Sequence, residues 1–419
     1  MSSVRLAAFR HRPYRLFWLS QVATNVGSWM MAVATGWLVL QITNSPAFLG
    51  YNAAIQAAPI LFFSLIGGVV ADRFDRLKLS RWAQVVQIVP DAILAWLVTS
   101  GNIRVEHVFA YSFLTATING LSTPARQALT PSLVPRDSLL SAVALNSILW
   151  QGSAVLGPAL AGLILGSWGL SGSFNLNVVS DLVSLALLAF VRAAPHRIEI
   201  RSGAGWRGIR DGAVYAWHHP YVRPMLVGVG LVTLLGRPYA QIMPVFARDV
   251  FHVGAEGLGV MMTVPAAGTI VVGVLMALLP KIPLVRFFFA TWASYGLALL
   301  VFSFTRNFPL ALVMLFIVGA STTATAAATN TLLQQIAEER MRGRVMSLYM
   351  ASTWGTWRVG SLPLGLLATA WGAPLSMALF AAILLAALLP NVRNRALLAL
   401  DGPQPAPPAL VATERRVTV

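Results

Sequence analysis

Long apolar segments recur along the whole chain, and they restrict what it can fold into more than any other feature. A helix needs roughly 20 mostly apolar residues to cross about 30 Å of hydrocarbon. Twelve segments meet this requirement, and they run approximately over residues 16–40, 47–71, 79–100, 105–125, 139–166, 172–191, 224–247, 257–279, 284–304, 308–330, 345–370 and 373–392. The sequence therefore predicts an all-α membrane protein with twelve transmembrane helices.

The composition argues against a soluble enzyme. Charged residues make up only 11% of the chain, against about 25% in an ordinary soluble domain. The chain has no cysteine, which excludes disulfides, thiolate metal sites and cysteine nucleophiles. It has no phosphate-binding Walker loop and no zinc-ligand spacing. We therefore expect no enzymatic activity, no cofactor and no metal.

The basic residues indicate how the chain lies in the membrane. The formal net charge is +16, and 25 of the 30 Lys and Arg fall in the termini and in alternate loops. Only Arg104, Arg248 and Arg306 fall in the other loops. Since positive charge accumulates on the cytoplasmic side, this bias predicts a multi-pass protein of the cell membrane with both termini in the cytoplasm. Charge spread over loops that face membrane lipids also argues against a nucleic-acid partner.

The chain divides into two similar halves. Its longest internal connection separates the first six apolar segments from the last six. Trp150-Gln151-Gly152 in the fifth segment has a counterpart in Trp354-Gly355-Thr356, about 204 residues later. Parallel halves are typical of transporters. We expect two pseudo-symmetric six-helix bundles, at residues 1–192 and 223–392, joined by a cytoplasmic linker at 193–222. The proline-rich tail, 393–419, is expected to be a disordered cytoplasmic segment.

The second segment ends in a glycine, acid and base pattern. Gly68 removes a side chain where two helices could approach closely. Asp72 follows one helical turn later and could face the positive N-terminus of a neighbouring helix. The bases that follow could hold the acid or reach lipid phosphates; they are Arg73, Arg76 and Lys78. The pattern resembles the gating motif of the major facilitator superfamily, with Asp75 where that family usually has glycine. The alternative is a simple positive-inside loop.

The fifth segment carries a second pattern of small residues around a proline. Its members are Gly152, Gly157, Pro158 and Gly162, and it resembles the glycine–proline motif of exporters in that superfamily. Proline bends the helix, and the glycines would allow close packing between the two halves, although ordinary small-residue packing would leave the same pattern. Further segments resemble the enterobactin-exporter-like branch, also called transmembrane secretion effectors; they are residues 25–29, 124–126, 133–136 and 340–346. The resemblance extends from Phe17 to about Pro390.

The resemblance also implies where substrate would bind. In the superfamily, spans one, four, seven and ten line a central cavity. The polar residues at that depth would then be cavity candidates; they are Gln21, Asn25, Thr115, Asn119, Arg237, Tyr239, Gln241 and Thr322. Arg358, in span eleven, would lie near the interface of the halves, and Trp357 could stack on an aromatic substrate. Each polar residue could instead serve only to pack helices together.

The residues also suggest how transport could be driven. Many branch members carry an acid in span one where this chain has Ser28, so the remaining buried acids, Asp91 and Asp181, are the candidates for proton coupling. We favour Asp181, because its span leads into the connection between the halves. A structural role for both is equally compatible with the sequence. The leading hypothesis is a proton-coupled exporter of a small organic molecule, either a drug-like compound or a siderophore. The alternatives are uptake, lipid flipping, or a sensor or scaffold that transports nothing.

Overall fold

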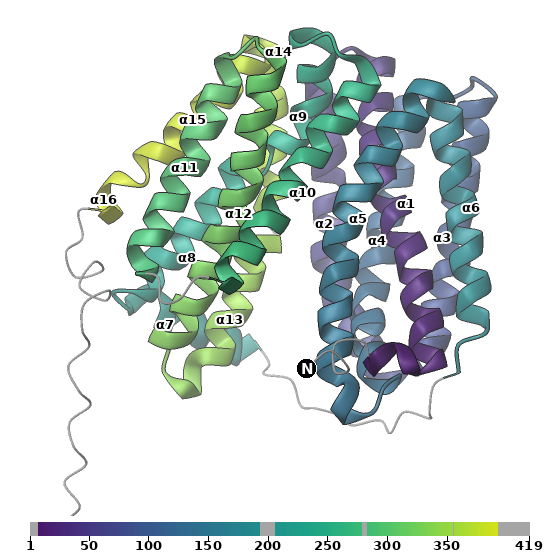
Figure 1. Ribbon diagram of the computed structural model, residues 1–419, viewed down its shortest axis with the longest axis horizontal. Coiled ribbons are helices and arrows are strands. Elements are labelled where there is room, and N and C mark those ends of the chain that lie inside the picture. The colour runs from purple at the N-terminus through teal and green to yellow at the C-terminus, as the bar shows by residue number, and fades with distance from the viewer. Residues whose placement is uncertain (1–6, 193–205, 279–282, 355, 393–419) are drawn as a thin grey trace, which may run out of the picture.

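The computed structural model describes residues 7–192, 206–278, 283–354 and 356–392, and within these ranges the chain is helical and contains no β-strand (Figure 1). The predicted tail, 393–419, and the first part of the predicted linker, 193–205, lie outside the described residues. The remainder of that linker contains a helix, α7 (Trp206–His218).

Six long helices form an N-terminal group. They are α1 (Arg12–Thr43), α2 (Pro46–Arg73), α3 (Arg76–Thr99), α4 (Val105–Leu129), α5 (Leu139–Ser167) and α6 (Gly169–Ala189). Helix α2 packs on α4, α1 packs on α5 and α6, and α3 packs on α4 and α6. The turn between α1 and α2 uses residues suited to it: Asn44 adopts a left-handed conformation with φ 48°, and Pro46 begins the next helix, where its missing N–H is not needed.

The C-terminal group is less regular. It contains α8 (Val222–Leu231), α9 (Tyr239–Val245), α10 (Gly254–Leu278), α11 (Leu284–Phe304), α12 (Phe308–Ile336), α13 (Glu339–Trp354), α14 (Thr356–Trp371), α15 (Ala373–Ala386) and α16 (Leu389–Val392). Two π-helical segments, Val232–Gly236 and Phe246–Val250, follow α8 and α9. The predicted seventh span is therefore a broken helix.

Nine helical segments among the described residues are long and apolar enough to cross a membrane, so three of the twelve expected spans fall short. Helix α4 has the expected position but carries Glu106 and His107 and a run of hydroxyl and amide side chains. The expected eleventh span is described as α13 and α14, and residue 355 between them lies outside the described residues. The twelfth is shortened to the 14 residues of α15, because Pro390 has no N–H with which to continue that helix.

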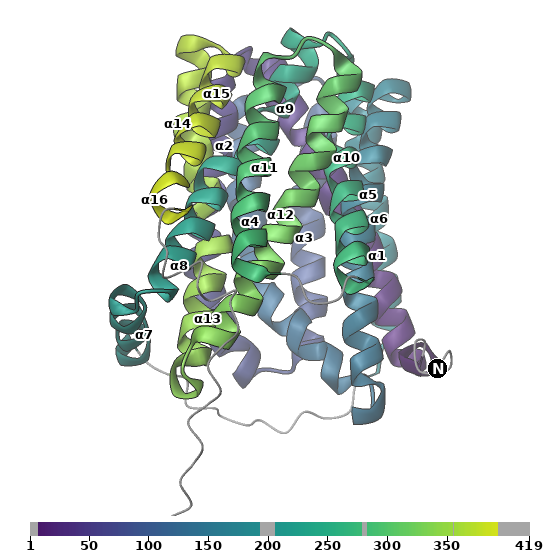
Figure 2. The same ribbon diagram turned by 60° about the vertical axis from the view of Figure 1, so that its left-hand side comes forward.

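The two groups meet at one end of the molecule. We call the end where α1 begins and α2 ends the basic end, and the other the opposite end. At the opposite end, the backbone N–H of Ala47 donates to Oγ1 of Thr369 at 2.9 Å, and Arg248 donates to Leu40 O and Asn44 Oδ1. Helix α2 packs on α14 and α5 packs on α10 across the groups. The ribbons of the two groups diverge toward the basic end, where α7 and α13 lie (Figures 1 and 2).

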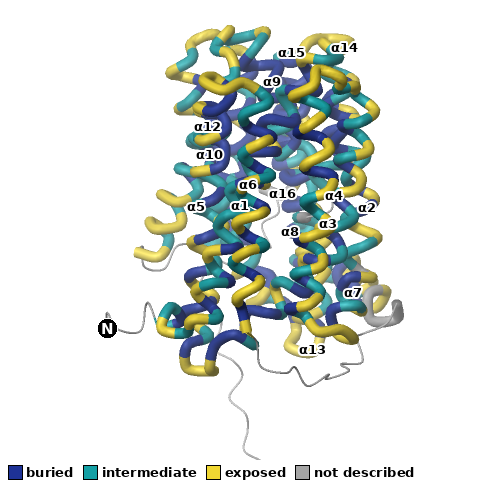
Figure 3. The backbone as a smooth tube through the Cα atoms, turned by 90° about the vertical axis from the view of Figure 1, so that its right-hand side faces the viewer, coloured by how far each residue is buried: buried dark blue, intermediate teal, exposed yellow. Residues whose placement is uncertain are grey.

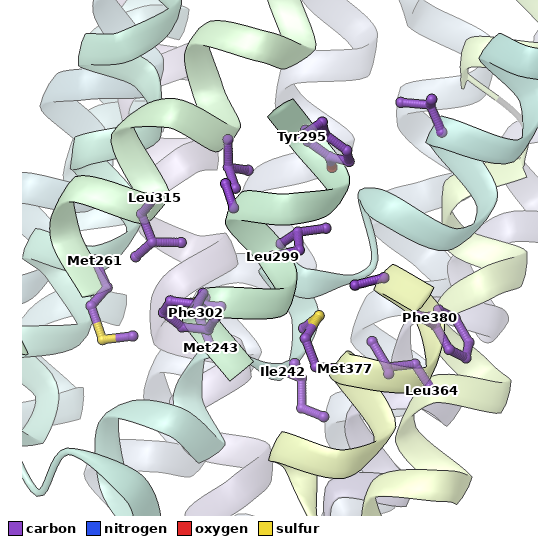
Figure 4. Packing of buried hydrophobic residues seen from close by; sticks show 14 of the residues in the cluster. Ile242, Met243, Met261, Tyr295, Leu299, Phe302, Leu315, Leu364, Met377 and Phe380 are labelled. Carbon is purple, nitrogen blue, oxygen red and sulfur yellow. The ribbon is translucent and has the colours of Figure 1, made fainter. Parts of the chain in front are cut away.

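Burial is distributed as a lipid-facing protein requires. Buried residues concentrate on the inward faces of the helices, while the outer faces are exposed (Figure 3). Large apolar side chains are nevertheless exposed on the outside, including Trp82, Trp96 and Leu163, each at more than 60%, which suits hydrocarbon rather than water. Inside the C-terminal group, Tyr295, Leu299 and other side chains of α9, α11, α12, α14 and α15 pack into one apolar core (Figure 4).

Candidate functional site

The turn after α2 holds the predicted gating residues, and the structure shows how Asp75 replaces the usual glycine. Asp75 has an extended conformation, and its Oδ1 accepts hydrogen bonds from the backbone N–H groups of Leu77 and Lys78, both at 2.9 Å. It therefore caps the N-terminus of α3. Asp72 is exposed and has no hydrogen bond or ion pair with any described residue. The guanidinium of Arg76 donates to the carbonyl of Ala128 at 3.1 Å, so in this state it contacts the end of α4 and not Asp72.

The expected close helix contact at Gly68 is wrong for this structure, because the neighbouring glycine makes it. A Cβ on Gly67 would stand 2.6 Å from the carbonyl oxygen of Leu121 and 2.7 Å from that of Gly120, whereas a Cβ on Gly68 would meet nothing within 4 Å. Gly67 therefore allows α2 and α4 to pack together. The sequence showed two adjacent glycines, and only the rotation of α2 determines which one faces its neighbour.

The three motif glycines of α5 lie in three different surroundings. A Cβ on Gly157 would contact Trp29 and stand 2.9 Å from the carbonyl of Val26, both on α1 of the same group. A Cβ on Gly162 would stand 2.8 Å from the Cα of Gly259 on α10, in the other group, and one on Gly152 would meet nothing within 4 Å. Gly162 thus lies at a contact between the groups, whereas the expectation that the whole glycine face packs between the halves is wrong for Gly157 and Gly152.

The two buried acids lie in one polar network inside the N-terminal group. Asp181, which is 4% exposed, accepts hydrogen bonds from Gln84 Nε2 at 2.8 Å and Asn177 Nδ2 at 3.2 Å. Asp91, which is 3% exposed, accepts from the hydroxyl of Tyr111 at 2.8 Å and from an adjacent amide on its own helix. The two carboxyl groups also interact directly with each other. This network joins α3, α4 and α6.

One cation approaches this network. Nη2 of Arg126, near the end of α4, donates to Oε1 of Gln84 at 3.1 Å, and its charge acts on Asp181. Gln84 thus connects the guanidinium to the carboxylate. Neither Gln84 nor Asn177 is among the residues predicted from the sequence. Asn177 stands four residues before Asp181 and Gln84 seven before Asp91, so their helical spacing from the buried acids was the available signal.

Most predicted cavity residues on spans one, four and ten bond to their own helix. Asn25 donates to the carbonyl of Gln21, Thr115 to that of Ser112, and Thr322 to that of Val318. These contacts fit the packing role that the sequence left open. Asn119 is exposed, and Tyr239 and Gln241 are half-buried on α9.

The break in span seven brings two arginines together. Arg237 lies between the π-helical segment and α9, and Arg358 lies near the start of α14. Gly360 makes this approach possible, because a Cβ there would contact the carbonyl of Leu234 and stand 3.0 Å from Pro238. The guanidinium carbon of Arg358 is 4.3 Å from the ring centre of Trp357, and its Nε is buried with no hydrogen-bond partner among the described residues.

The charges of Arg237 and Arg358 act on each other, and Arg237 also acts on Tyr239 and Tyr295. The described residues contain no cluster of three His, Asp or Glu side chains that could hold a metal ion. The groups that could contact a ligand at the break in span seven are therefore two arginine cations and the aromatic rings around them.

The sequence matches a family model described as transmembrane secretion effector over residues 3–407. Two relatives align along most of their length. The staphyloferrin A transporter of Staphylococcus aureus is 25% identical over 85% of this chain and 90% of that protein. The multidrug efflux pump Tap of Mycobacterium tuberculosis is 24% identical over 86% of this chain and 88% of that protein. The macrolide efflux protein A of Streptococcus pyogenes is 23% identical over 62% of this chain and 65% of that protein.

Solved transporters share the fold at low sequence identity. A crystal structure of the peptide transporter POT superposes with a TM-score of 0.73 at 14% identity, covering 93% of this chain and 96% of that one. A bacterial homologue of the lysosomal transporter Spinster, in an inward-facing and occupied conformation, superposes with a TM-score of 0.68 at 16% identity over 93% and 95%.

Proposed function

Because this chain belongs to the transmembrane secretion effector family of major facilitator superfamily transporters, we propose that it exports a small organic molecule by secondary active transport. Proteins of this family are transporters and not enzymes, and the apolar helices make the chain a multi-pass protein of the cell membrane. The observation that supports export most directly is that relatives aligned along most of their length include a multidrug efflux pump.

The proposed topology has twelve spans in two six-helix bundles, with both termini in the cytoplasm. The three expected spans that are not among the nine apolar segments occupy the expected positions, and their described helices contact other helices of their own group. The basic end carries the loops where Lys and Arg accumulate, so we assign it to the cytoplasmic side.

We further propose that this conformation opens to the cytoplasm. The groups are joined at the opposite end by Gly162 with Gly259 and by Ala47 with Thr369, and they diverge at the basic end (Figure 1). Asp72 has no hydrogen bond or ion pair with the described residues, which suits a gate whose contact forms only when the groups close over it. Rocking of one group against the other would expose the substrate alternately to the two sides.

The paired carboxyl groups are the proposed proton site. Two buried carboxylates beside a single guanidinium, that of Arg126, would leave an uncompensated negative charge in a medium of low dielectric constant. One proton shared between Asp91 and Asp181 would neutralise the cluster. Because Arg126 reaches the carboxylates through Gln84, a shift of α4 during rocking could change their charge environment and so release the proton.

A single transport assay tests both the substrate class and the direction of transport. We propose a drug-like compound or a siderophore, since named relatives handle both classes. Everted membrane vesicles that express the protein should accumulate such a compound when they are energised, and a protonophore should abolish accumulation. Accumulation in right-side-out vesicles would instead support uptake, and movement of labelled lipid would support flipping. Failure to move any compound of a broad panel would favour the sensor or scaffold.

The proton site has its own test. In proteoliposomes, the wild type should release protons when substrate is added, and Asp91→Asn and Asp181→Asn should each weaken this release. Replacing the exposed acid Asp137 by Asn is the matched control. Normal coupling in both buried variants would mean that the proton is carried elsewhere.

A further inference from the structure

The strongest unexplained feature of the molecule is the pair Arg237 and Arg358. Arg237 precedes the end of its span at Val250 by thirteen residues, and Arg358 precedes the end of α14 at Trp371 by the same number. At about 1.5 Å per residue, both lie roughly 20 Å from the opposite end, well inside a hydrocarbon layer of about 30 Å. Charges at this depth are costly to bury, and in known membrane proteins they mark substrate or ion paths.

Nothing among the described residues neutralises this pair. The ion pairs there join Arg248 to Asp249 and Arg344 to Asp211. The other acids of the C-terminal group stand at helix ends and contact neither arginine; they are Glu256, Glu338 and Glu339. Among the described residues, Arg237 is a charge that acts on Arg358, and it repels it. Two repelling cations without a counter-ion therefore share one region of the membrane interior.

The surroundings of the pair are aromatic. Trp357 lies beneath the guanidinium of Arg358 at 4.3 Å, and the buried Nε of that guanidinium has no hydrogen-bond partner in the described part of the chain. Tyr239 and Tyr295 lie within the electrostatic reach of Arg237. A guanidinium presents parallel N–H groups that match the two oxygens of a carboxylate, and aromatic rings favour a flat apolar body.

We propose that Arg237 and Arg358 form the binding site for an amphipathic organic carboxylate, which supplies the missing counter-charge while its apolar part packs on Trp357. The assignment rests on the proposed transport function, for which it names the substrate class. The broken helix that presents Arg237 fits this role, because irregular backbone at membrane depth occurs where it faces a ligand or water-filled path. The site disfavours organic cations, because each would add a third positive charge.

Equilibrium binding of two matched probes tests the proposal. Pyrenebutyrate and pyrenebutylamine share an aromatic body and carry opposite charges. With the purified full-length protein in phosphatidylcholine nanodiscs, pyrenebutyrate should bind saturably and pyrenebutylamine at least about tenfold more weakly. Arg237→Gln and Arg358→Gln should each weaken pyrenebutyrate binding at least about tenfold. Arg237→Lys and Arg358→Lys should retain part of it. Arg306→Gln, which removes an exposed arginine from an outer loop, should bind as the wild type does.

Thermal stability gives a second measurement that does not depend on these probes. Without ligand, Arg358→Gln should raise Tm, because it removes the repulsion between the two guanidiniums. Citrate or pyrenebutyrate should raise the Tm of the wild type above the value in chloride at equal ionic strength, and should raise that of Arg358→Gln less.

Equal probe binding by wild type and both Gln variants, or no carboxylate stabilisation of the wild type, would overturn the proposal. A protein that binds carboxylates but exports nothing would refute the exporter and leave this site intact.

Discussion

Gly162 of α5 and Gly259 of α10 touch across the two helix groups, with a hypothetical Cβ on Gly162 only 2.8 Å from the Cα of Gly259. We expect Gly162→Ala to separate these helices at the opposite end and to cost about 1–3 kcal/mol of stability. Gly152→Ala on the same helix has open space and should be neutral or stabilising by up to about 1 kcal/mol. Thermal unfolding in nanodiscs measures both, and equal Tm values for the two variants would contradict the packing.

The adjacent glycines at the end of α2 should separate stability from transport. Gly67 faces the backbone of α4, so Gly67→Ala should lower Tm and cost about 1–3 kcal/mol. Gly68 has open space in this state, so Gly68→Leu should keep Tm but slow transport if the gate closes on that face. A normal transport rate in Gly68→Leu would show that nothing closes there.

Asp72 should matter for function and not for stability. It is exposed and has no partner among the described residues, so Asp72→Asn should leave the free energy of unfolding within about 0.5 kcal/mol of the wild-type value. A full negative charge is needed to meet a helix N-terminus in the closed state, so transport should fall roughly tenfold. Transport assays at equal membrane abundance test this, with the exposed acid Asp137 changed to Asn as the control. Wild-type transport by Asp72→Asn would show that the charge has no part in gating.

Arg81 ties the end of α6 to α3. Its guanidinium donates to three backbone carbonyls, those of Leu188 at 3.0 Å, Ala189 at 3.1 Å and Val191 at 2.6 Å. The carbonyl of Leu188 also accepts from the backbone N–H of Val191, while carbonyls at a helix end otherwise lack intrahelical partners, so Arg81→Gln should cost about 1–3 kcal/mol. Arg73→Gln removes an exposed arginine with no hydrogen bond to the described residues and should cost little. If the two variants unfold alike, the contacts of Arg81 contribute nothing measurable.

His219, between α7 and α8, should make stability depend on pH. Burial lowers the pKa of its imidazole below the ordinary 6.5, and the charge of Glu338 opposes this only in part. The Nδ1 of the neutral ring accepts from the backbone N–H groups of Tyr221 and Val222, both at 3.3 Å. The unfolded chain takes up the proton near pH 6.5 and the folded chain only at lower pH. The stabilising contribution is therefore complete above pH 6.5 and declines as the pH falls through this window.

The variant His219→Asn keeps a capping acceptor that does not titrate. Its Tm should fall less than that of the wild type between about pH 7.5 and about pH 5.5. His218→Gln, at the exposed neighbouring position, is the control. Parallel Tm changes in wild type and His219→Asn would show that another group causes the pH dependence.

The sequence by itself determined the class of this protein and the position of most helices. Apolar segments of about 20 residues leave no alternative to membrane helices, because an unpaired backbone group in hydrocarbon costs several kcal/mol. The pattern ending at Lys78 indicated the family, which the full-length family match confirms. Hydropathy alone cannot show that the helix of span seven is interrupted at Arg237.

Only the tertiary structure decided which of several similar residues makes each contact. Gly67 and not Gly68 packs on α4, and of the three glycines in the α5 motif Gly162 is the one that reaches the other group, because the rotation of a helix about its axis depends on all its neighbours. Asp91 and Asp181 are 90 residues apart in sequence, and their common network exists only because α3 packs on α6. Arg237 and Arg358 become a pair for the same reason: Gly360 lets α14 approach the broken helix, and no local pattern in the sequence records that approach.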